Sequence, residues 1–226
     1  KMADLLINPK TVLAWLMTTV GAPPALVAWL VPIRESGALI PQLVIGAWVR
    51  RHPLRRPFWV LGSIGQGLCV LGMAGAVWWL RGLEAGLAII ALLVAFSLSR
   101  GLSSVAIKDV EGKTIPKMRR GRLSGLATTV SGLGTLVLAL MLFAGQRDPS
   151  VPFYTGLLLG AGLLWWLAAA LFSRIREEPG ETSGGENALG RALANLALLR
   201  DDRVFRHFVI TRALLMASAL GSPFLV

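Results

Sequence analysis

A charged stretch between two uncharged apolar runs constrains the fold of this chain more than any other feature. Residues 101–125 hold six Lys and Arg side chains against Asp109 and Glu111, whereas residues 86–98 and 126–145 carry no charge. A cationic connection between two apolar runs is typical of a loop between membrane spans, and the positive-inside rule places such a loop on the cytoplasmic side. The orientation of every other predicted span follows from this assignment.

The composition favours a membrane protein and argues against one that binds nucleic acid. Hydrophobic residues make up 54% of the 226 residues and charged residues only 15%, whereas soluble domains average about 25% charged residues. The net charge of +11 lies largely in short connections between apolar runs, where membrane orientation explains it without a nucleic-acid partner. We therefore predict an all-α, polytopic membrane protein in contact with the lipid bilayer.

Apolar runs divide the chain into a bundle, a polar connection and the start of a second bundle. Residues 1–173 form the predicted amino-terminal bundle, whose spans lie near 1–10 (partial), 24–49, 58–80, 85–104, 123–144 and 152–172. Residues 174–206 are predicted as a central loop with an amphipathic helix near 188–199, and residues 207–226 as the start of the second bundle. The prediction is thus a six-helix bundle, truncated at both ends.

The second span has two possible boundaries. A span at 12–31 would leave residues 37–49, a run of 13, which is too short because a bilayer core needs about 20 residues. A span at 24–49 is long enough and begins with proline, which helices tolerate in their first turn. We adopt the second boundary, which places Arg34 and Glu35 inside the membrane.

The numbers of Lys and Arg in the connections test this topology. The connections after Val49, after the 85–104 span and after Phe172 carry four, six and six, and those at 81–84 and 146–150 carry one each. A strict alternation of basic and nearly neutral connections is what the positive-inside rule requires of one consistent topology. It predicts a multi-pass protein whose central loop is cytoplasmic.

Two motifs in the connections resemble those of a known family. The segment GAWVRRHPLRRP places Gly46, Arg51 and Arg55 as in a G-x-x-x-D-R-x-G-R-R motif, although Arg50 and Pro53 stand at its Asp and second Gly positions. The fourth span and the following loop contain a second progression: Arg100, Gly101, Asp109, Pro116, Arg120, Gly121, Arg122 and Gly125. The chain therefore resembles the amino-terminal half of a major facilitator superfamily transporter. The strings PIRESG and KDVEGKTIPK resemble those of prokaryotic members.

The resemblance implies a secondary active transporter that moves a small solute by alternating access, with the missing carboxy-terminal half of the same transporter as its partner. No ATP-binding motif is visible, so we expect a proton gradient to drive transport, with no cofactor and no enzymatic activity. The implied location is the prokaryotic cytoplasmic (inner) membrane. Two other classes stay open, namely a non-transporting scaffold or sensor built on a transporter bundle and a membrane-embedded lipid-modifying enzyme.

The same resemblance implies a gating role for the motif residues in the cytoplasmic loops. These residues are Gly46, Arg51, Arg55, Arg100, Asp109, Arg120, Gly121 and Arg122. Arg100 ends the fourth span, so we expect it to bridge to Asp109 or to the loop after the second span, or to anchor the span at the membrane interface.

Charged residues inside the predicted spans are the candidate site residues. A charge at mid-bilayer costs about 3 kcal/mol on insertion scales, so it persists mainly where it faces a cavity or a partner. Adjacent helical residues point about 100° apart, so Arg34 and Glu35 each need a different partner. We predict that Glu35 carries the coupling proton and that Arg34 holds an anionic substrate or locks the cavity. Alternatively, the pair lies in an exterior turn between two half-helices.

Asp4 and Arg212 are the other candidates for substrate binding or proton coupling. Asp4 would face the central cavity from the partial first span, or would be a helix-end charge if residue 1 is a true terminus. Arg212 lies several residues into the last span and is predicted to face the cavity from the other half.

Metal and nucleotide sites are not expected from the sequence. His52 and His207 have no second His, Asp or Glu at metal-ligand spacing. Gly112-Lys113-Thr114 imitates the end of a P-loop, but the position that requires glycine holds Ile107 and no strand precedes it.

Overall fold

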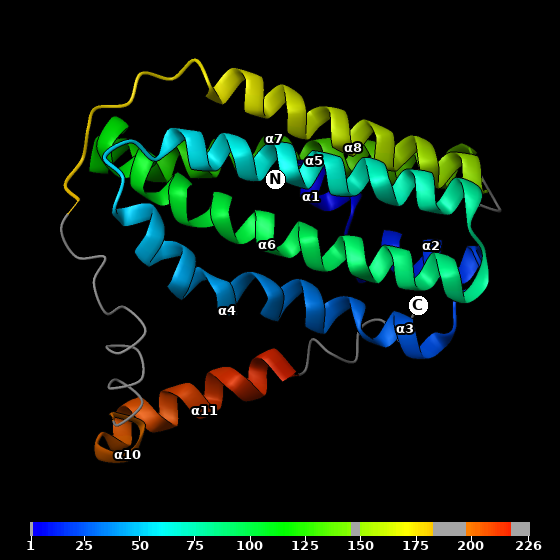
Figure 1. Ribbon diagram of the computed structural model, residues 1–226, viewed down its shortest axis with the longest axis horizontal. Helices are drawn as coiled ribbons and strands as arrows, with labels where there is room; N and C mark the ends of the chain where they lie inside the picture. The colour runs from blue at the N-terminus through cyan, green and yellow to red at the C-terminus, as the bar shows by residue number, and fades with distance from the viewer. Residues whose placement is uncertain (1, 146–149, 183–197, 218–226) are drawn as a thin grey trace.

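The computed structural model describes residues 2–145, 150–182 and 198–217, and every regular element in that part of the chain is a helix (Figure 1). The helices are α1 (Met2–Leu6), α2 (Val12–Thr19), α3 (Pro24–Ala28), α4 (Leu30–Arg50), α5 (Arg56–Trp79), α6 (Gly82–Thr114), α7 (Lys117–Gly145), α8 (Val151–Phe172), α10 (Leu198–Asp201) and α11 (Arg203–Ala217). The all-α prediction is confirmed.

Three of the described helices, α5, α6 and α8, are long and apolar enough to cross a membrane. They contain 24, 33 and 22 residues, which at 1.5 Å per residue correspond to about 36, 50 and 33 Å. A bilayer hydrocarbon core is about 30 Å thick, so each helix can span it and α6 extends well beyond it. The prediction of a polytopic membrane protein is confirmed.

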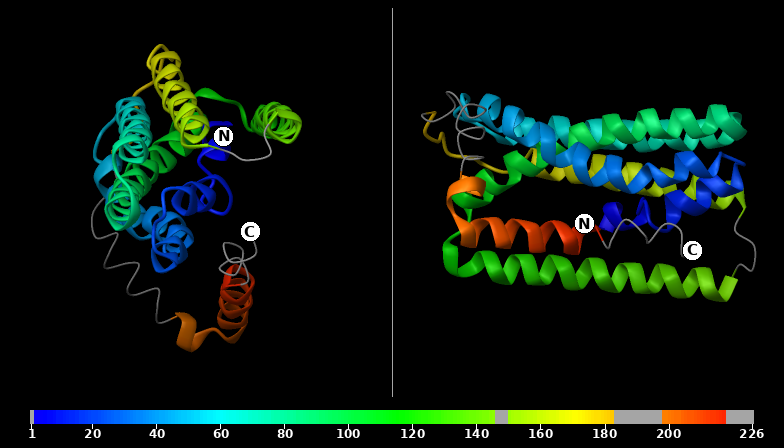
Figure 2. Two further views of the ribbon diagram at one scale, coloured as in Figure 1. Left: turned by 90° about the vertical axis from the view of Figure 1, so that its right-hand side faces the viewer. Right: turned by 90° about the horizontal axis from the view of Figure 1, so that it is seen from below.

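Helix α5 lies between α6 and α8, and α4 packs on the other side of α6 (Figures 1 and 2). Small residues permit the close approach of α5 and α6, because a Cβ on Gly62 would lie only 2.6 Å from the carbonyl oxygen of Ser99. Lipid provides no hydrophobic drive for helix association, so close backbone packing at small residues is a main source of stability in a membrane bundle. In Figure 2, α7 and α11 lie to the side of this four-helix group.

Neither of the first two predicted spans is one continuous helix. Pro9 lies in the connection between α1 and α2, where the Asn8 side chain accepts a 2.9 Å hydrogen bond from the Lys10 backbone N–H. The predicted 24–49 span is divided into α3 and α4, which meet at Trp29. The Ile33 N–H donates to the Trp29 carbonyl oxygen, so the second helix begins directly where the first ends. Arg34 therefore lies within the first turns of α4.

Helices α6 and α7 extend into the segment that the sequence predicts as a loop. Instead of ending at residue 104, α6 continues to Thr114, and α7 begins at Lys117 in place of residue 123. Only Ile115 and Pro116 separate them, because proline disfavours a helical conformation at the preceding residue. Arg120 donates to the carbonyl oxygens of Ile115 and Gly112 and so satisfies free acceptors at the end of α6. The charged stretch is therefore mostly helical.

The remaining predicted elements lie partly outside the described residues. The amphipathic helix predicted near 188–199 falls mostly in residues 183–197, and the connection around Arg147 falls in residues 146–149; the structure describes neither segment. The helix predicted to begin at residue 207 begins at Arg203.

Candidate functional site

Asp4 joins two arginines from two other helices. Arg34 of α4 places its Nη2 atom 2.8 Å from Asp4 Oδ1, and Arg100 of α6 places its Nη1 atom 2.5 Å from the same oxygen. The exposed fractions of the Arg34 and Asp4 side chains are 7% and 24%, and that of Arg100 is 37%. We call these three residues the Asp4 cluster. It links α1, α4 and α6, which are far apart in sequence.

The Asp4 cluster carries a net positive charge, because two guanidinium groups share one carboxylate. Arg34 also lies over the ring of Phe96, with its Cζ 5.0 Å from the ring centroid, a geometry in which the aromatic face attracts the cation. The Nη1 atom of Arg34 is buried and has no hydrogen-bond partner among the described residues. The cluster thus has one more positive charge, and at least one more donor, than Asp4 can satisfy.

A cavity of about 530 Å³ lies beside the Asp4 cluster. Asp4 and Arg100 line it together with residues of α5, α6, α7 and α8. The remaining lining residues are Met2, Trp59, Gln66, Ser103, Ser104, Ile107, Glu111, Ala127, Val130, Ser131 and Trp165. Seven of these thirteen residues are polar or charged, but apolar atoms provide most of the surface of the wall.

Two buried polar groups in this wall have no partner among the described residues. Gln66 is fully buried and donates through Nε2 to the Gly62 carbonyl and to Ser103 Oγ, each at 3.1 Å, while its Oε1 atom accepts nothing. The indole Nε1 of Trp165 is likewise buried and unpaired. Buried polar groups are normally hydrogen-bonded, so an acceptor and a donor at the cavity wall mark it as a candidate binding site.

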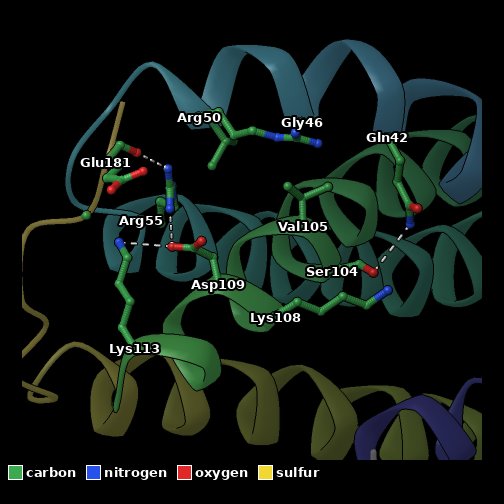
Figure 3. Close-up of a pocket in the computed structure, with 12 residues that line it drawn as sticks. Gln42, Gly46, Arg50, Arg55, Ser104, Val105, Lys108, Asp109, Lys113 and Glu181 are labelled. Atoms are coloured by element: carbon green, nitrogen blue, oxygen red, sulfur yellow. Dashed lines mark hydrogen bonds and ion pairs between the residues drawn. The ribbon is translucent and has the colours of Figure 1, made fainter. Parts of the chain in front are cut away.

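A second charged cluster joins α5, α6 and the segment after α8. Asp109 Oδ2 pairs with Arg55 and, at 2.9 Å, with Lys113 Nζ (Figure 3). Lys113 Nζ also lies 3.0 Å from Glu177 Oε1. The Glu177 side chain is only 1% exposed. We call Arg55, Asp109, Lys113 and Glu177 the Asp109 cluster. It holds together the three connections that carry most of the basic residues.

Glu177 also caps the N-terminus of α5. Its carboxylate accepts the backbone N–H of Arg55 in two bonds of 2.9 Å and that of Arg56 at 2.6 Å. A negative charge is stabilising there because the first N–H groups of a helix are unpaired and the helix dipole is positive at that end. The Arg55 side chain donates to the carbonyl of Glu181 at 2.8 Å, which fixes the same segment from the other side.

A cavity of about 770 Å³ opens beside the Asp109 cluster between α4 and α6 (Figure 3). Its charged lining residues are Arg50, Arg55, Lys108, Asp109, Lys113 and Glu181, and Gln42 donates to Ser104 Oγ at 3.3 Å across it. The predicted apolar span of α6 ends at residue 104, and Asp109 lies five residues, or roughly 7 Å, beyond that point. The Asp109 cluster is thus a candidate gate at the membrane surface.

Comparison with protein-family models gives one decisive match, to the Major Facilitator Superfamily over residues 5–226. The chain belongs to the major facilitator superfamily. Comparison with curated proteins gives no match, and comparison with solved structures gives none. Membership confirms the resemblance of the chain to this superfamily. It also makes the chain part of a multi-pass membrane transporter of the major facilitator type, a family of transporters rather than enzymes.

In this major facilitator chain, the predicted site residues separate into groups. Asp4 and Arg34 come together, and Arg100 joins them instead of Asp109 or the loop after the second span. Glu35 lies on an exposed face of α4 and makes no hydrogen bond or ion pair with the described residues. Arg212 is exposed on α11, so its predicted place at the cavity is not seen in the described part of the chain.

The predicted gating residues are similarly divided. Arg55 and Asp109 are paired, and Gly46 is buried with Val105 of α6 nearby. Arg51 and Arg122 are exposed and Gly121 has open space around it. Arg120 caps α6 and takes no part in the Asp109 cluster.

Sequence reasoning missed Glu177, Gln66 and Trp165. Gln66 is an uncharged polar residue in the middle of an apolar run, which is a signal that could have singled it out. Glu177 precedes Glu178 in a polar connection and no local pattern distinguishes the two. Trp165 lies within an apolar run, and no local pattern distinguishes it from the other apolar residues there. Among the described residues, no group of three or more His, Cys, Asp or Glu side chains is arranged to hold a metal ion.

Proposed function

We propose that this major facilitator transporter moves a small solute by alternating access and couples its movement to protons through Asp4. The observation that carries the proposal is the sharing of one Asp4 oxygen by Arg34 and Arg100. A charge inside a membrane bundle is costly and persists where it serves a pathway or a proton relay. Asp4 is the only carboxylate that contacts both arginines among the described residues.

Protonation of Asp4 would change the charge of its whole cluster. With Asp4 ionised the cluster carries one net positive charge, and with Asp4 neutral it carries two. The arginines then have donors that an anionic group of a solute can satisfy, so binding of a proton and binding of the solute favour each other. Thermodynamic linkage makes this coupling reciprocal.

Glu35 is a weaker candidate for the coupling proton than Asp4. It lies on an exposed face of α4 with no ion-pair partner among the described residues, whereas Asp4 contacts two cations. Protonation of a coupling carboxylate must change the free energy of one conformation more than that of the other. Protonation of a carboxylate in an ion-pair cluster has this effect because it removes the charge that the cluster needs.

The Asp109 cluster would act as the gate on the cytoplasmic side. It ties together the connections before α5, at the end of α6 and after α8. Their Lys and Arg excess favours the cytoplasmic side of the membrane, which we propose to be a prokaryotic inner membrane. We propose a second helix bundle as the partner that completes the pathway, with α11 as its beginning. Rocking of two bundles about a site between them is the usual basis of alternating access.

Reconstitution of the intact transporter into proteoliposomes with an internal pH dye tests this function. Carboxylates, amino acids, sugars and amines are added outside as separate solute gradients, and uptake and internal pH are followed together. The proposal predicts at least one solute whose uptake carries protons across the membrane. Uptake that moves no protons and does not respond to an imposed pH gradient contradicts the proton coupling.

A further inference from the structure

We infer that the cavity beside the Asp4 cluster binds an organic monoanion, one carboxylate on an apolar body. This inference rests on the proposed function, because it names the class of solute for the same site. It follows from three features of the cavity, which are a cation with free donors at one end, an apolar wall, and a carboxylate at the other end.

Arg100 provides the anion-binding end. Its side chain is 37% exposed and lines the cavity, and of its five N–H donors the described contacts use only the one on Nη1 toward Asp4. A guanidinium can present two parallel N–H groups to a carboxylate, a geometry that a lysine cannot match. Arg34 binds the same oxygen of Asp4 and so compensates the charge of that carboxylate.

The apolar wall accounts for the body of the solute. Trp59 and Trp165 lie on α5 and α8, and Val130 lies on α7, so apolar side chains from three helices surround the same space. A volume of about 530 Å³ is within the usual range for small-molecule sites. The unpaired Gln66 Oε1 and Trp165 Nε1 atoms can each bond a polar substituent on that body.

Glu111 lies at the opposite end of the cavity from Arg100 and limits the bound solute to one negative charge. It lines the cavity eleven residues after Arg100 on α6, a helical rise of roughly 16 Å. A second carboxylate at the far end of a long solute bound at Arg100 would approach Glu111 and be repelled. Discrimination by such a repulsive contact is a common device for specificity.

Equilibrium binding of radiolabelled benzoate to the purified, intact transporter in nanodiscs tests the inference. Benzoate binds saturably, and Arg100→Gln weakens its binding at least about tenfold, as expected for loss of a charged hydrogen bond. Arg174→Gln, at an exposed arginine outside the cavity, leaves binding unchanged. Neutral benzamide and cationic benzylamine compete poorly. Binding of benzylamine in preference to benzoate, or benzoate binding that Arg100→Gln leaves intact, overturns the inference.

A second variant keeps the test decisive if Arg100→Gln fails to fold. Biphenyl-4,4′-dicarboxylate, which is long enough to bring a second carboxylate near Glu111, competes poorly with benzoate in the wild type, and Glu111→Gln improves its competition relative to that of biphenyl-4-carboxylate. Equal competition in both proteins contradicts the role of Glu111. Binding needs no gradient, so benzoate binding without proton movement contradicts only the proposed coupling. Proton-driven uptake of other solutes by a protein that binds no benzoate contradicts only this inference.

Discussion

Arg34 and Asp4 are separated by 30 positions in the sequence, and their side chains meet through Arg34 Nη2 and Asp4 Oδ1 at 2.8 Å. Removing one partner of a buried ion pair is expensive because it leaves the other charge uncompensated. In this protein the pair also fixes the short helix α1 against α4, and it places Asp4 beside Arg100.

The two side chains are therefore energetically coupled. We expect Asp4→Asn and Arg34→Gln each to lower the free energy of unfolding in detergent, and the double variant to lose less than the sum. The expected coupling energy is about 1–3 kcal/mol, since contacting residues in one ionic network are not additive. A double-mutant cycle measured by reversible unfolding checks this, and additivity within about 0.5 kcal/mol would show that the pair contributes nothing specific.

Glu177 is expected to hold the start of α5 in place. Glu177→Gln removes the negative charge that accepts the Arg55 and Arg56 N–H groups, and we expect it to cost about 1–3 kcal/mol. Faster hydrogen–deuterium exchange of residues 54–58 is the measurement. The matched control is Glu178→Gln, which changes an exposed neighbour. Equal exchange in both variants would show that Glu177 does not cap the helix.

The close packing of α5 on α6 predicts different costs at two glycines. Gly62→Ala places a Cβ against the Ser99 carbonyl, and we expect overpacking to lower the free energy of unfolding by about 1–3 kcal/mol. Gly156→Ala adds a Cβ where nothing lies within 4 Å and is expected to be neutral or slightly stabilising, since alanine favours helix. Thermal unfolding of both variants checks this. A tolerated Gly62→Ala would contradict the packing of the two helices.

The orientation of the chain is testable by labelling single cysteines in intact cells. Met118 is 94% exposed beside the α6–α7 connection, and Leu83 is exposed in the first turn of α6. With Cys69 replaced by serine, we expect Leu83→Cys to react with a membrane-impermeant maleimide and Met118→Cys to react only after permeabilisation. The reverse pattern would invert the topology and move the Asp109 cluster to the outside.

Charge and hydropathy patterns in the sequence predict the helical class and the order of the spans, because both depend on local composition. The three basic connections are also predicted to share one surface, and the contacts of Asp109 and Glu177 join them. The end of α6 is harder to predict, because the mixed polar and apolar sequence of residues 105–114 is compatible with a helix as well as with a loop. Only Pro116 is a local signal for its end.

The partners of the charged residues could not be predicted from the sequence. The length and rotation of α1 and α4 decide that Arg34 faces Asp4 while its neighbour Glu35 faces outward, and these follow from packing across the whole bundle. The same reason explains Arg100, whose partner lies 96 positions away. Gln66 and Trp165 are candidate binding residues only because they line a cavity formed by five helices, which the sequence does not reveal.

Transport by Asp4→Asn and Glu35→Gln variants in proteoliposomes tests the central claim most directly. Two rates are measured for each protein, the uptake of a transported solute under an imposed pH gradient and its exchange at equal solute concentrations without one. We predict that Asp4→Asn loses gradient-driven accumulation and retains exchange, while Glu35→Gln behaves as the wild type. Accumulation that survives in Asp4→Asn, or is lost in Glu35→Gln alone, would contradict the assignment of Asp4 as the coupling carboxylate.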